Sequence, residues 1–307
     1  MKWVKRNIIS IKEFSRAEID YVLERSAVME KLFASGKAYG LMNGRILATL
    51  FFEPSTRTRL SFSAAMERLG GSVIGFDEIA GTSVGKGESV VDTAKMAAAY
   101  ADIIVMRNQL EGSARLVSEH VDVPVINGGD GANQHPTQTL LDLYTLKKEF
   151  GGIDGLNITL IGDLKYGRTV HSLAEALKQY KVSLKFISPK ELRMPRRITK
   201  DLIEIGIDVK EASQLDVKDS DVLYVTRIQK ERFPDPIEFE KVKDAFILDA
   251  ENIKDLKKNA VILHPLPRVN EIHTSVDGTK HARYFEQARN GIPVRMALLC
   301  MVCGVKF

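Results

Sequence analysis

Hydroxyl and guanidinium side chains gather between two apolar segments in residues 51–71, whose sequence is FFEPSTRTRLSFSAAMERLGG. The apolar run before them predicts a buried strand, and apolar residues at helical spacing after them predict a helix that ends at two glycines. Ser55, Thr56 and Thr58 would then offer hydroxyls at the helix N-terminus, where backbone N–H groups carry partial positive charge. Adding the guanidinium of Arg57 predicts a binding site for a dianionic phosphate. An ordinary capped helix with solvated arginines is the alternative interpretation.

Three later loops also place polar side chains after predicted strands. The glycine-rich loop AGTSVGKGES carries Ser83 and Lys86, and Arg107 ends the buried strand DIIVMR. In the loop NGGDGANQHPTQ, His135 and Gln138 are three residues apart, which puts them on one face of the first turn of a helix. A histidine there can donate a hydrogen bond to a carbonyl oxygen as negative charge grows on that oxygen. Ligands of parallel sheets bind at the carboxyl ends of strands, so these side chains could converge on the phosphate site.

The second half of the chain offers groups suited to carboxylates and amines. The turn GDLKYGRT has the outline of a nucleotide-binding P-loop, but Arg168 replaces its lysine. A planar guanidinium suits a bidentate grip on a carboxylate, so a nucleotide-binding protein is a remote alternative. Arg227 and Gln229 lie on one side of the extended segment after the strand DVLYVT. The loop HPLPRVNEI offers backbone carbonyls at Leu266 and Pro267, and we predict a cis peptide bond between these two residues, since the cis form is accessible before proline.

Length and composition limit the classes of protein to which this chain can belong. At 307 residues, with 44% hydrophobic and 27% charged residues, the sequence is typical of a globular protein with two domains. No apolar run approaches membrane-spanning length and the N-terminus lacks the apolar core of a signal peptide, so we expect a cytoplasmic protein. A net charge of +4 without basic runs gives no indication of nucleic-acid binding. Cys300 and Cys303 form one isolated C-x-x-C pair, which indicates buried structural thiols rather than a metal site.

The order of the predicted elements provides a scaffold for these side chains. Strands and helices alternate from residue 45 to residue 127, and a second series of strands starts at NITLIG. Such alternation predicts an α/β protein with two parallel-sheet α/β domains. We place the first domain at residues 1–135 and the second at residues 136–285, joined by interdomain helices. The apolar C-terminal helix, residues 286–307, is expected to pack back on the first domain.

Taken together, the motifs resemble the catalytic chain of aspartate carbamoyltransferase. The stretches that carry the resemblance occur in the same order across nearly the whole chain: FFEPSTRTRLSF, TSVGKGES, VMR, NGGDGANQHPTQTLLDL, GDLKYGRTVHS, VTRIQKERF and HPLPRVNEI. S-T-R-T-R and H-P-x-Q are shared by all carbamoyltransferases, including the ornithine enzyme. That enzyme has a cysteine in the loop formed here by residues 264–267, and it lacks GDLKYGRT and TRIQKER. The amino-acid half of the site therefore points to aspartate, with ornithine as the alternative acceptor.

The resemblance implies a reaction and an assembly. The carbamoyl group of carbamoyl phosphate would pass to the α-amine of L-aspartate, giving N-carbamoyl-L-aspartate and phosphate, the committed step of de novo pyrimidine biosynthesis. The implied carbamoyltransferase fold uses no cofactor or metal, and its domains here would bind carbamoyl phosphate (residues 1–135) and aspartate (residues 136–285). A cyclic homotrimer is implied, in which Ser83 and Lys86 come from a neighbouring subunit, and a separate zinc-binding regulatory chain is a candidate partner. The Lys86 loop is one residue shorter than the G-K-K-G form of some members, so only one lysine is available.

A role for each site residue also follows from the resemblance. Carbamoyl phosphate would be bound by Ser55, Thr56, Arg57, Thr58, Arg107, His135, Gln138, Leu266 and Pro267. Aspartate would be bound by Lys86, Arg168, Arg227 and Gln229. The catalytic residues implied are Arg57, Lys86, Arg107 and His135. Charge would build on the carbonyl oxygen facing His135 and Arg107, and Arg57 would stabilise the departing phosphate.

Overall fold

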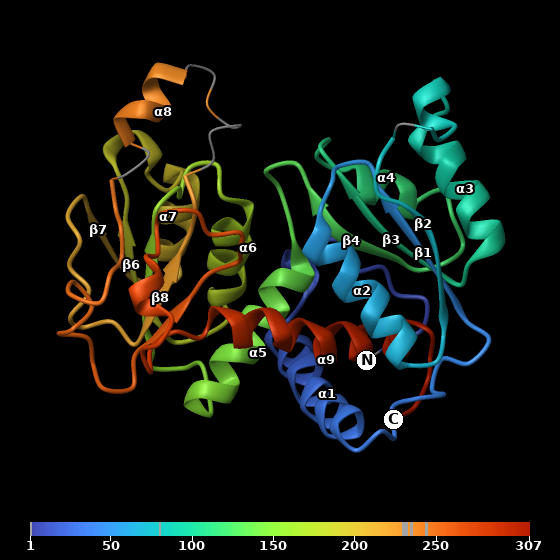
Figure 1. Ribbon diagram of the computed structural model, residues 1–307, viewed down its shortest axis with the longest axis horizontal. Coiled ribbons are helices and arrows are strands. Elements are labelled where there is room, and N and C mark those ends of the chain that lie inside the picture. The colour runs from blue at the N-terminus through green and yellow to red at the C-terminus, as the bar shows by residue number, and fades with distance from the viewer. Residues whose placement is uncertain (1, 80, 229–232, 234–235, 243–244) are drawn as a thin grey trace. The chain divides into compact units, whose positions relative to one another are not determined.

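The computed structural model describes residues 2–79, 81–228, 233, 236–242 and 245–307. The chain divides into two compact units, one comprising Met1–Tyr144 and Asn290–Phe307 and the other Thr145–Arg289. Each unit has its own parallel sheet with its own helices, coloured along the chain in Figure 1. The prediction of two parallel-sheet α/β domains is therefore confirmed. The chain passes from one unit to the other within the helices α5 (Pro136–Phe150) and α9 (Tyr284–Val302).

The sheet of the first unit is built from short, mainly apolar runs. Its strands are β1 (Ile46–Phe51), β2 (Ser72–Phe76), β3 (Ile103–Asn108) and β4 (Val125–Asp130). All pairs are parallel, in the order β2-β1-β3-β4, so β1, β3 and β4 are neighbours. Nearly every residue of these three strands is buried, as expected for a parallel sheet that is covered on both faces.

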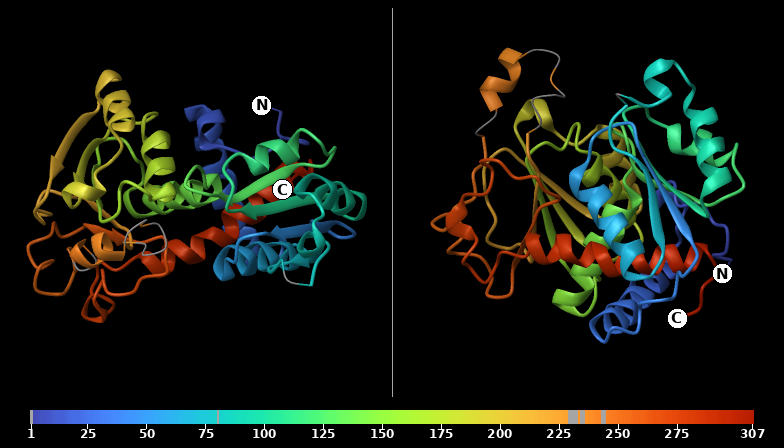
Figure 2. Two further views of the ribbon diagram at one scale, coloured as in Figure 1. Left: turned by 90° about the horizontal axis from the view of Figure 1, so that it is seen from above. Right: turned by 45° about the vertical axis from the view of Figure 1, so that its right-hand side comes forward.

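Helices cover both faces of this sheet. They are α1 (Arg16–Ala34), α2 (Thr56–Arg68), α3 (Val90–Tyr100) and α4 (Ser113–Ser118), with the short 3-10 helices η1 (Ile11–Glu13) and η2 (Val84–Lys86). Ala48, Leu50, Ile104 and Met106 share one apolar cluster with buried residues of α3 and α4. Because side chains alternate along a strand, the residues between them face the opposite side, where α2 lies (Figure 2).

The second unit repeats this construction with a five-stranded parallel sheet. Its strands are β5 (Asn157–Ile161), β6 (Ser183–Ile187), β7 (Asp208–Ala212), β8 (Val222–Val225) and β9 (Val261–Leu263). Their order is β7-β6-β5-β8-β9, which makes β5 and β8 neighbours. The described helices of this unit are α6 (Arg168–Leu177), α7 (Arg196–Glu204) and α8 (Pro236–Val242), with η3 (Lys190–Leu192) and η5 (Thr274–Val276).

The C-terminal segment, Asn290–Phe307, belongs to the first unit, where the Lys5 N–H donates to the Val302 carbonyl over 2.8 Å. Cys300 is buried and Cys303 is half-buried, and burial raises the pKa of these thiols to about 12 and about 11. Thiols that stay protonated at neutral pH are poor nucleophiles, in agreement with the structural role that the sequence predicts. Within the described residues, no group of His, Cys, Asp and Glu side chains could hold a metal ion.

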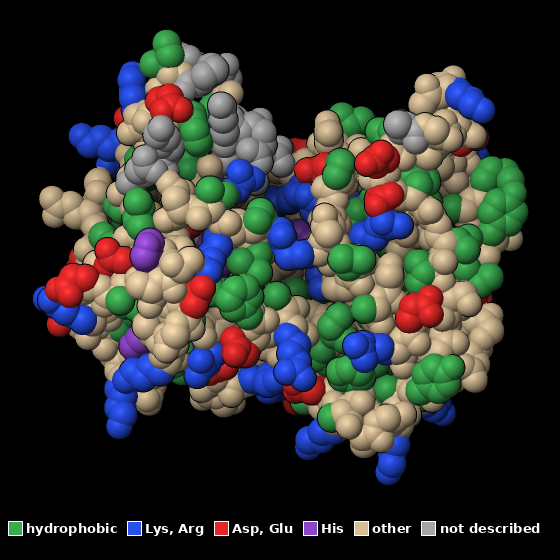
Figure 3. Space-filling view, in the orientation of Figure 1, with side chains coloured by type: hydrophobic (Ala, Val, Ile, Leu, Met, Phe, Trp, Pro, Cys, Tyr) green, Lys and Arg blue, Asp and Glu red, His purple; other side chains and the backbone are tan. Residues whose placement is uncertain are grey.

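The surface mixes charges of both signs. On the face seen in Figure 3, Lys and Arg side chains are interspersed with Asp and Glu side chains on each unit. None of the described helices is long and apolar enough to cross a membrane.

Candidate active site

The predicted phosphate site lies where β1 ends and α2 begins. The strand ends at Phe51 and the helix begins at Thr56. Ser55, before the helix, has φ −156° and ψ 89°, and its side chain makes no capping hydrogen bond within the described structure, so its hydroxyl is available to a ligand. Arg57 is exposed and Thr58 is buried. The strand, the turn and the helix start are those that the sequence predicts, and they present a guanidinium and backbone N–H groups at one helix N-terminus.

Arg107 lies beside this loop because β1 and β3 are neighbours in register. The strands pair Phe51 with Arg107, and the Phe52 N–H donates to the Arg107 carbonyl over 2.8 Å. The guanidinium donates from Nη1 to the Gly128 carbonyl and pairs through Nη2 with Glu53, each over 3.2 Å. These contacts fix the orientation of a side chain that is only 9% exposed. A cation is thereby held in place before any ligand arrives, as electrostatic catalysis requires.

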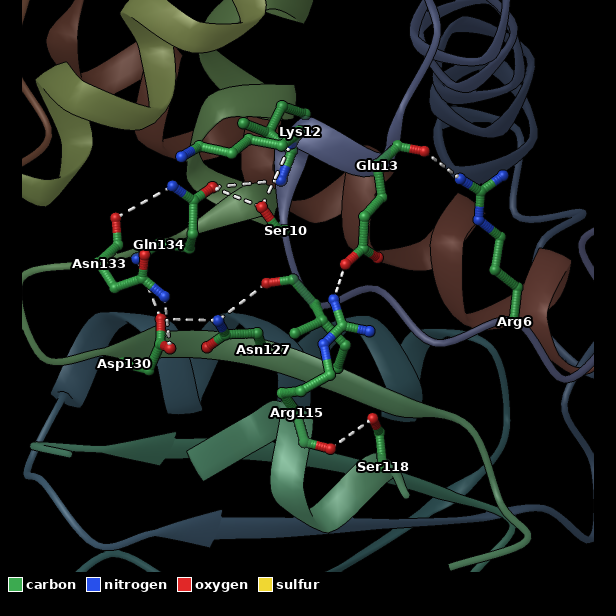
Figure 4. A network of polar contacts seen from close by, with 12 residues as sticks. Arg6, Ser10, Lys12, Glu13, Arg115, Ser118, Asn127, Asp130, Asn133 and Gln134 are labelled. Carbon is green, nitrogen blue, oxygen red and sulfur yellow. Dashed lines mark hydrogen bonds and ion pairs between the residues drawn. The ribbon is translucent and has the colours of Figure 1, made fainter. Parts of the chain in front are cut away.

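His135 follows β4 in a loop that one buried carboxylate organises (Figure 4). Four N–H groups donate to the Asp130 carboxylate: Asn127 Nδ2 and Gln134 N to Oδ1, and Gly112 N and Asn133 Nδ2 to Oδ2. The four distances are 2.9 or 3.0 Å, and Asp130 is 1% exposed. Because a buried carboxylate is costly unless its oxygens are satisfied, this network favours one path of the loop up to His135.

Gln134 ties the same loop to the N-terminal segment. Its Oε1 accepts from the Ser10 hydroxyl over 3.1 Å and from the Ile11 N–H over 3.3 Å, across 124 and 123 residues of sequence (Figure 4). Its Nε2 donates to the Asn133 carbonyl over 3.2 Å. The amide of Gln134 is therefore used on both sides, and the residue next to it, His135, is buried at the start of α5.

Gln138 lies in the first turn of α5 with its amide already oriented. Its Nε2 donates to Asp142 Oδ1 over 2.9 Å, which leaves the amide oxygen and a second N–H for a ligand. Asp142 is fully buried in the same unit as the buried Arg295. Burial lowers the pKa of Arg295 to about 10 although the charge of Asp142 acts to raise it, so this guanidinium is still protonated at neutral pH.

We expect Asp130→Asn to lower the free energy of unfolding by about 2–4 kcal/mol, because the new NH2 group would face buried N–H donors. Whichever way the amide turns, it meets a backbone N–H, from Gly112 or from Gln134. Urea or thermal unfolding at one protein concentration measures the change. Asp122→Asn, at an exposed position, is the matched control and should stay within about 0.5 kcal/mol of the wild type. Equal stability of the two variants would contradict the organising role of Asp130.

The first unit thus brings Thr58, Arg107 and His135 to the carboxyl edge of three neighbouring strands. Two of these residues, Thr58 and Arg107, lie next to Gly128 of β4. A Cβ at Gly128 would lie 3.5 Å from Thr58 Cγ2, and the Gly128 carbonyl accepts from Arg107. This edge is where ligands of parallel sheets bind.

Ser83 and Lys86 lie at η2, the single helical turn after β2. Both are exposed, and the Lys86 N–H donates to the Ser83 carbonyl over 3.0 Å. Gly87 ends the turn with φ +100°, a backbone conformation that favours glycine. The structure describes one chain, so the supply of Ser83 and Lys86 by a neighbouring subunit stays a prediction.

Arg168 and Arg227 follow the neighbouring strands β5 and β8 in the second unit. Gly162, directly after β5, has φ +112°, and a Cβ there would lie 2.3 Å from the Thr226 carbonyl, so only glycine allows the two strand ends to run this close. Asp163 is buried and accepts two backbone N–H groups of the following turn, over 3.1 and 2.9 Å, which shapes the turn that leads to Arg168. Both guanidinium groups are half-buried at adjacent strand ends.

The loop after β9 carries the remaining site residues that the structure describes. The Leu266–Pro267 peptide bond is cis, which confirms the prediction, and Leu266 has φ +56°. The Leu266 N–H donates to His264 Nδ1 over 2.8 Å, and His264 Nε2 lies 2.7 Å from Glu271 Oε1. Gln229, which the sequence predicts to bind aspartate, lies outside the described residues.

Sequence reasoning missed the residues that hold the site residues in place. They are Asn127, Asp130, Gln134, Asp142, His264 and Glu271. The density of Asn, Asp and Gln in NGGDGANQHP is a signal that could have marked three of them as hydrogen-bonding groups. From the sequence we expect Glu53 to pair with Arg168, and the structure records its ion pair with Arg107 of the neighbouring strand β3.

Two family models together match nearly the whole chain. The model of the aspartate/ornithine carbamoyltransferase carbamoyl-P binding domain matches residues 6–148, and that of the Asp/Orn binding domain matches residues 154–302. The aspartate carbamoyltransferase catalytic subunit of Thermococcus kodakarensis is 57% identical over 307 residues, which cover 99% of each chain.

Solved structures of similar proteins have the same fold. The catalytic subunit of M. jannaschii aspartate transcarbamoylase is 52% identical with a TM-score of 0.90, and the match covers 97% of this chain and 98% of that one. Aspartate transcarbamoylase from Trypanosoma cruzi, in complex with carbamoyl phosphate and aspartate, is 38% identical with a TM-score of 0.93, over 98% of this chain and 97% of that one.

Proposed function

The chain belongs to the aspartate/ornithine carbamoyltransferase family, and we propose that it transfers the carbamoyl group of carbamoyl phosphate to the α-amine of L-aspartate. The observation that carries the choice of acceptor is the pair Arg168 and Arg227 at the ends of the adjacent strands β5 and β8. Two guanidinium groups match the two carboxylates of aspartate, whereas ornithine has one carboxylate and a second cation. Gln229 would add an amide contact to the same substrate.

In the first unit, the proposed ligand of the β1–α2 loop is the phosphate of carbamoyl phosphate. Ser55, Thr56 and Thr58 would donate from hydroxyl or backbone groups, and Arg57 would supply the positive charge. The exposed guanidinium of Arg57 at a helix N-terminus supports this assignment.

The carbamoyl group would be bound by the side chains that follow β3 and β4. Arg107 and His135 would donate to its carbonyl oxygen, and Gln138 would contact its amide. In the second unit, Leu266 and Pro267 would receive the carbamoyl N–H groups at their backbone carbonyls. The fixed orientations of Arg107, through Glu53, and of Gln138, through Asp142, support these roles.

The chemistry needs no covalent enzyme intermediate. The α-amine nitrogen of aspartate attacks the carbamoyl carbon, a C–N bond forms, and the carbon–oxygen bond to phosphate breaks. The amine loses a proton, which the departing phosphate would accept. Negative charge that builds on the carbonyl oxygen would be stabilised by His135 and Arg107, and charge on the leaving phosphate by Arg57. The α-amine must be neutral to attack, and positive side chains such as Arg168 and Arg227 around the bound aspartate would favour loss of its proton. Holding both substrates together supplies much of the rate.

Assembly, regulation and location follow as further parts of the proposal. Ser83 and Lys86 would reach the site of a neighbouring subunit in a cyclic homotrimer, where Lys86 would bind aspartate. A zinc-binding regulatory chain is a candidate partner of that trimer. The reaction would be the committed step of de novo pyrimidine biosynthesis in the cytoplasm. The exposure of Ser83 and Lys86 in the turn after β2 supports a role outside their own chain.

A direct assay tests the proposed reaction. The purified protein is incubated with carbamoyl phosphate and L-aspartate, and both carbamoyl-aspartate and phosphate are measured. We expect the two products in equal amounts, and none when L-ornithine replaces aspartate. Turnover with ornithine, or phosphate release without any acceptor, would overturn the choice of substrate.

We expect Arg227→Ala to raise the KM for aspartate by roughly tenfold to a hundredfold, because a charged hydrogen bond to a carboxylate is lost. The Kd of carbamoyl phosphate, measured by calorimetry, should change less than about twofold. Arg197→Ala, which removes an exposed arginine of α7 in the same unit, is the control with unchanged constants. If both substrates lose affinity equally, Arg227 does not belong to the aspartate half of the site.

A further inference from the structure

A buried histidine begins the loop that carries Leu266. His264 is 1% exposed and directly follows β9. Its backbone N–H donates to Gln287 Oε1 over 2.8 Å, and Gln287, in α9, is also 1% exposed. The backbone of His264 is therefore anchored from outside the loop, while its ring contacts residues inside the loop.

The contacts of the two ring nitrogens define the tautomer of His264. The Leu266 N–H donates to Nδ1, so Nδ1 carries a lone pair rather than a proton. The proton of the ring is then on Nε2, from which it is donated to Glu271 Oε1. A doubly protonated ring would set an N–H against the Leu266 N–H. The neutral Nε2–H form satisfies both contacts.

Glu271 binds the far end of the loop that follows β9. While Oε1 accepts from His264, Oε2 accepts the backbone N–H groups of Val269 and Asn270, over 3.1 and 3.2 Å. Burial acts to raise the pKa of Glu271, but the hydrogen bonds from His264 and from the backbone outweigh burial and the pKa is lowered. Glu271 is thus a carboxylate at neutral pH, and it holds the His264 ring and the far end of the loop together.

Leu266 needs such an outside contact. Its φ of +56° lies in the left-handed region, which a residue with a side chain adopts only when its surroundings favour it. The contact from its N–H to His264 Nδ1 is a hydrogen bond that holds the peptide unit between Pro265 and Leu266 in place, and with it the N-terminal side of this left-handed residue. Turning the unit would break that bond and leave a buried ring nitrogen without a donor.

We propose that His264 is a positioning residue, which as a neutral imidazole accepts the Leu266 N–H, holds the Pro265–Leu266 peptide unit, and so anchors the turn that directs the Leu266 carbonyl toward its ligand. Glu271 supports it by accepting the proton of Nε2. The last step, the use of that carbonyl by carbamoyl phosphate, rests on the proposed function. The hydrogen bond by which His264 holds the backbone of Leu266 does not depend on the proposed function.

Two substitutions separate the two ring contacts. His264→Asn can keep an acceptor near the position of Nδ1, whereas His264→Gln can keep a donor near the position of Nε2. We expect His264→Gln to weaken carbamoyl phosphate binding about tenfold and His264→Asn to stay within about threefold of the wild type. Inorganic phosphate should bind all three proteins within about twofold, because its proposed ligands lie in the other unit. Equal losses for both variants, or a loss for phosphate as large as for carbamoyl phosphate, would overturn the proposal.

Hydrogen exchange at the Leu266 amide tests the same hold without reference to activity. Protection of this amide should persist in His264→Asn and fall at least about tenfold in His264→Gln. His273→Gln, at an exposed histidine of the same unit, should leave the protection unchanged. If the wild type forms no carbamoyl-aspartate while the amide follows this pattern, the proposed function fails and the positioning role stands. If the amide is equally protected in all variants, the positioning role fails whatever the activity.

A measurement on the wild type covers the case in which a variant does not fold. The chain has six histidines, and selective 15N labelling of their rings reports the protonation of each one by NMR. A neutral Nε2–H ring is expected for His264 at neutral pH. A cationic ring, or a proton on Nδ1, would be incompatible with an N–H donated from Leu266 and would overturn the proposal.

Discussion

Arg57→Ala is expected to lower kcat by at least about a hundredfold, as the loss of one preorganised charge-stabilising donor does in other enzymes. The phosphate carries more charge as it leaves than while carbamoyl phosphate is bound, so the guanidinium contributes more in the transition state than in the ground state. The KM for carbamoyl phosphate should therefore rise less than kcat falls. Steady-state kinetics with both substrates varied measures the two effects separately.

The control for this variant lies on the same helix. Arg68→Ala removes an exposed guanidinium near the C-terminal end of α2 and changes the net charge by the same amount. Its kcat should stay within about twofold of the wild type. An Arg57→Ala enzyme that differed from Arg68→Ala only in KM would show that Arg57 binds the substrate without stabilising the departing phosphate.

Mixed trimers of two inactive variants are expected to regain about a quarter of the wild-type sites. One chain carries Lys86→Ala and the other Arg57→Ala, and each alone should form trimers without appreciable activity. In a closed ring, each site would take Arg57 from one chain and Lys86 from the next. About three-quarters of randomly assembled rings are mixed, and each mixed ring has one junction of three with both residues intact, which gives the quarter.

Activity should return only after the trimers have been dissociated and reassembled together. Wild-type protein taken through the same treatment shows how much activity survives, and each variant reassembled alone gives the background. The measurement is the specific activity of the reassembled mixture at equal amounts of the two chains. A mixture as inactive as its parents would mean that Lys86 acts within its own chain.

The sequence by itself determined the elements and the local motifs. The strand before residue 52, the start of α2 beside Arg57 and the alternation that gives two parallel sheets follow from apolar periodicity, helix capping and turn residues. The cis form before Pro267 is accessible because the bond precedes a proline, and the structure adopts it. All these features depend on residues that are close together in sequence, so their spacing alone carries the information. The resemblance of the motifs then gave the family and the reaction.

Only the tertiary structure decided which groups hold the site residues in their orientations. Arg107 donates a hydrogen bond to Glu53, which is 54 residues away in sequence, and Gln134 accepts one from Ser10, which is 124 residues away. The buried carboxylate of Asp130 takes donors from residues as far away as 18 positions. The sequence alone does not show which residue a polar side chain will bond to, because hydrogen bonds of this kind form only after the sheet has brought distant segments together. Once buried, each such polar group must have a hydrogen-bond partner. This requirement limits each side chain of the site to one defined orientation in the packed fold.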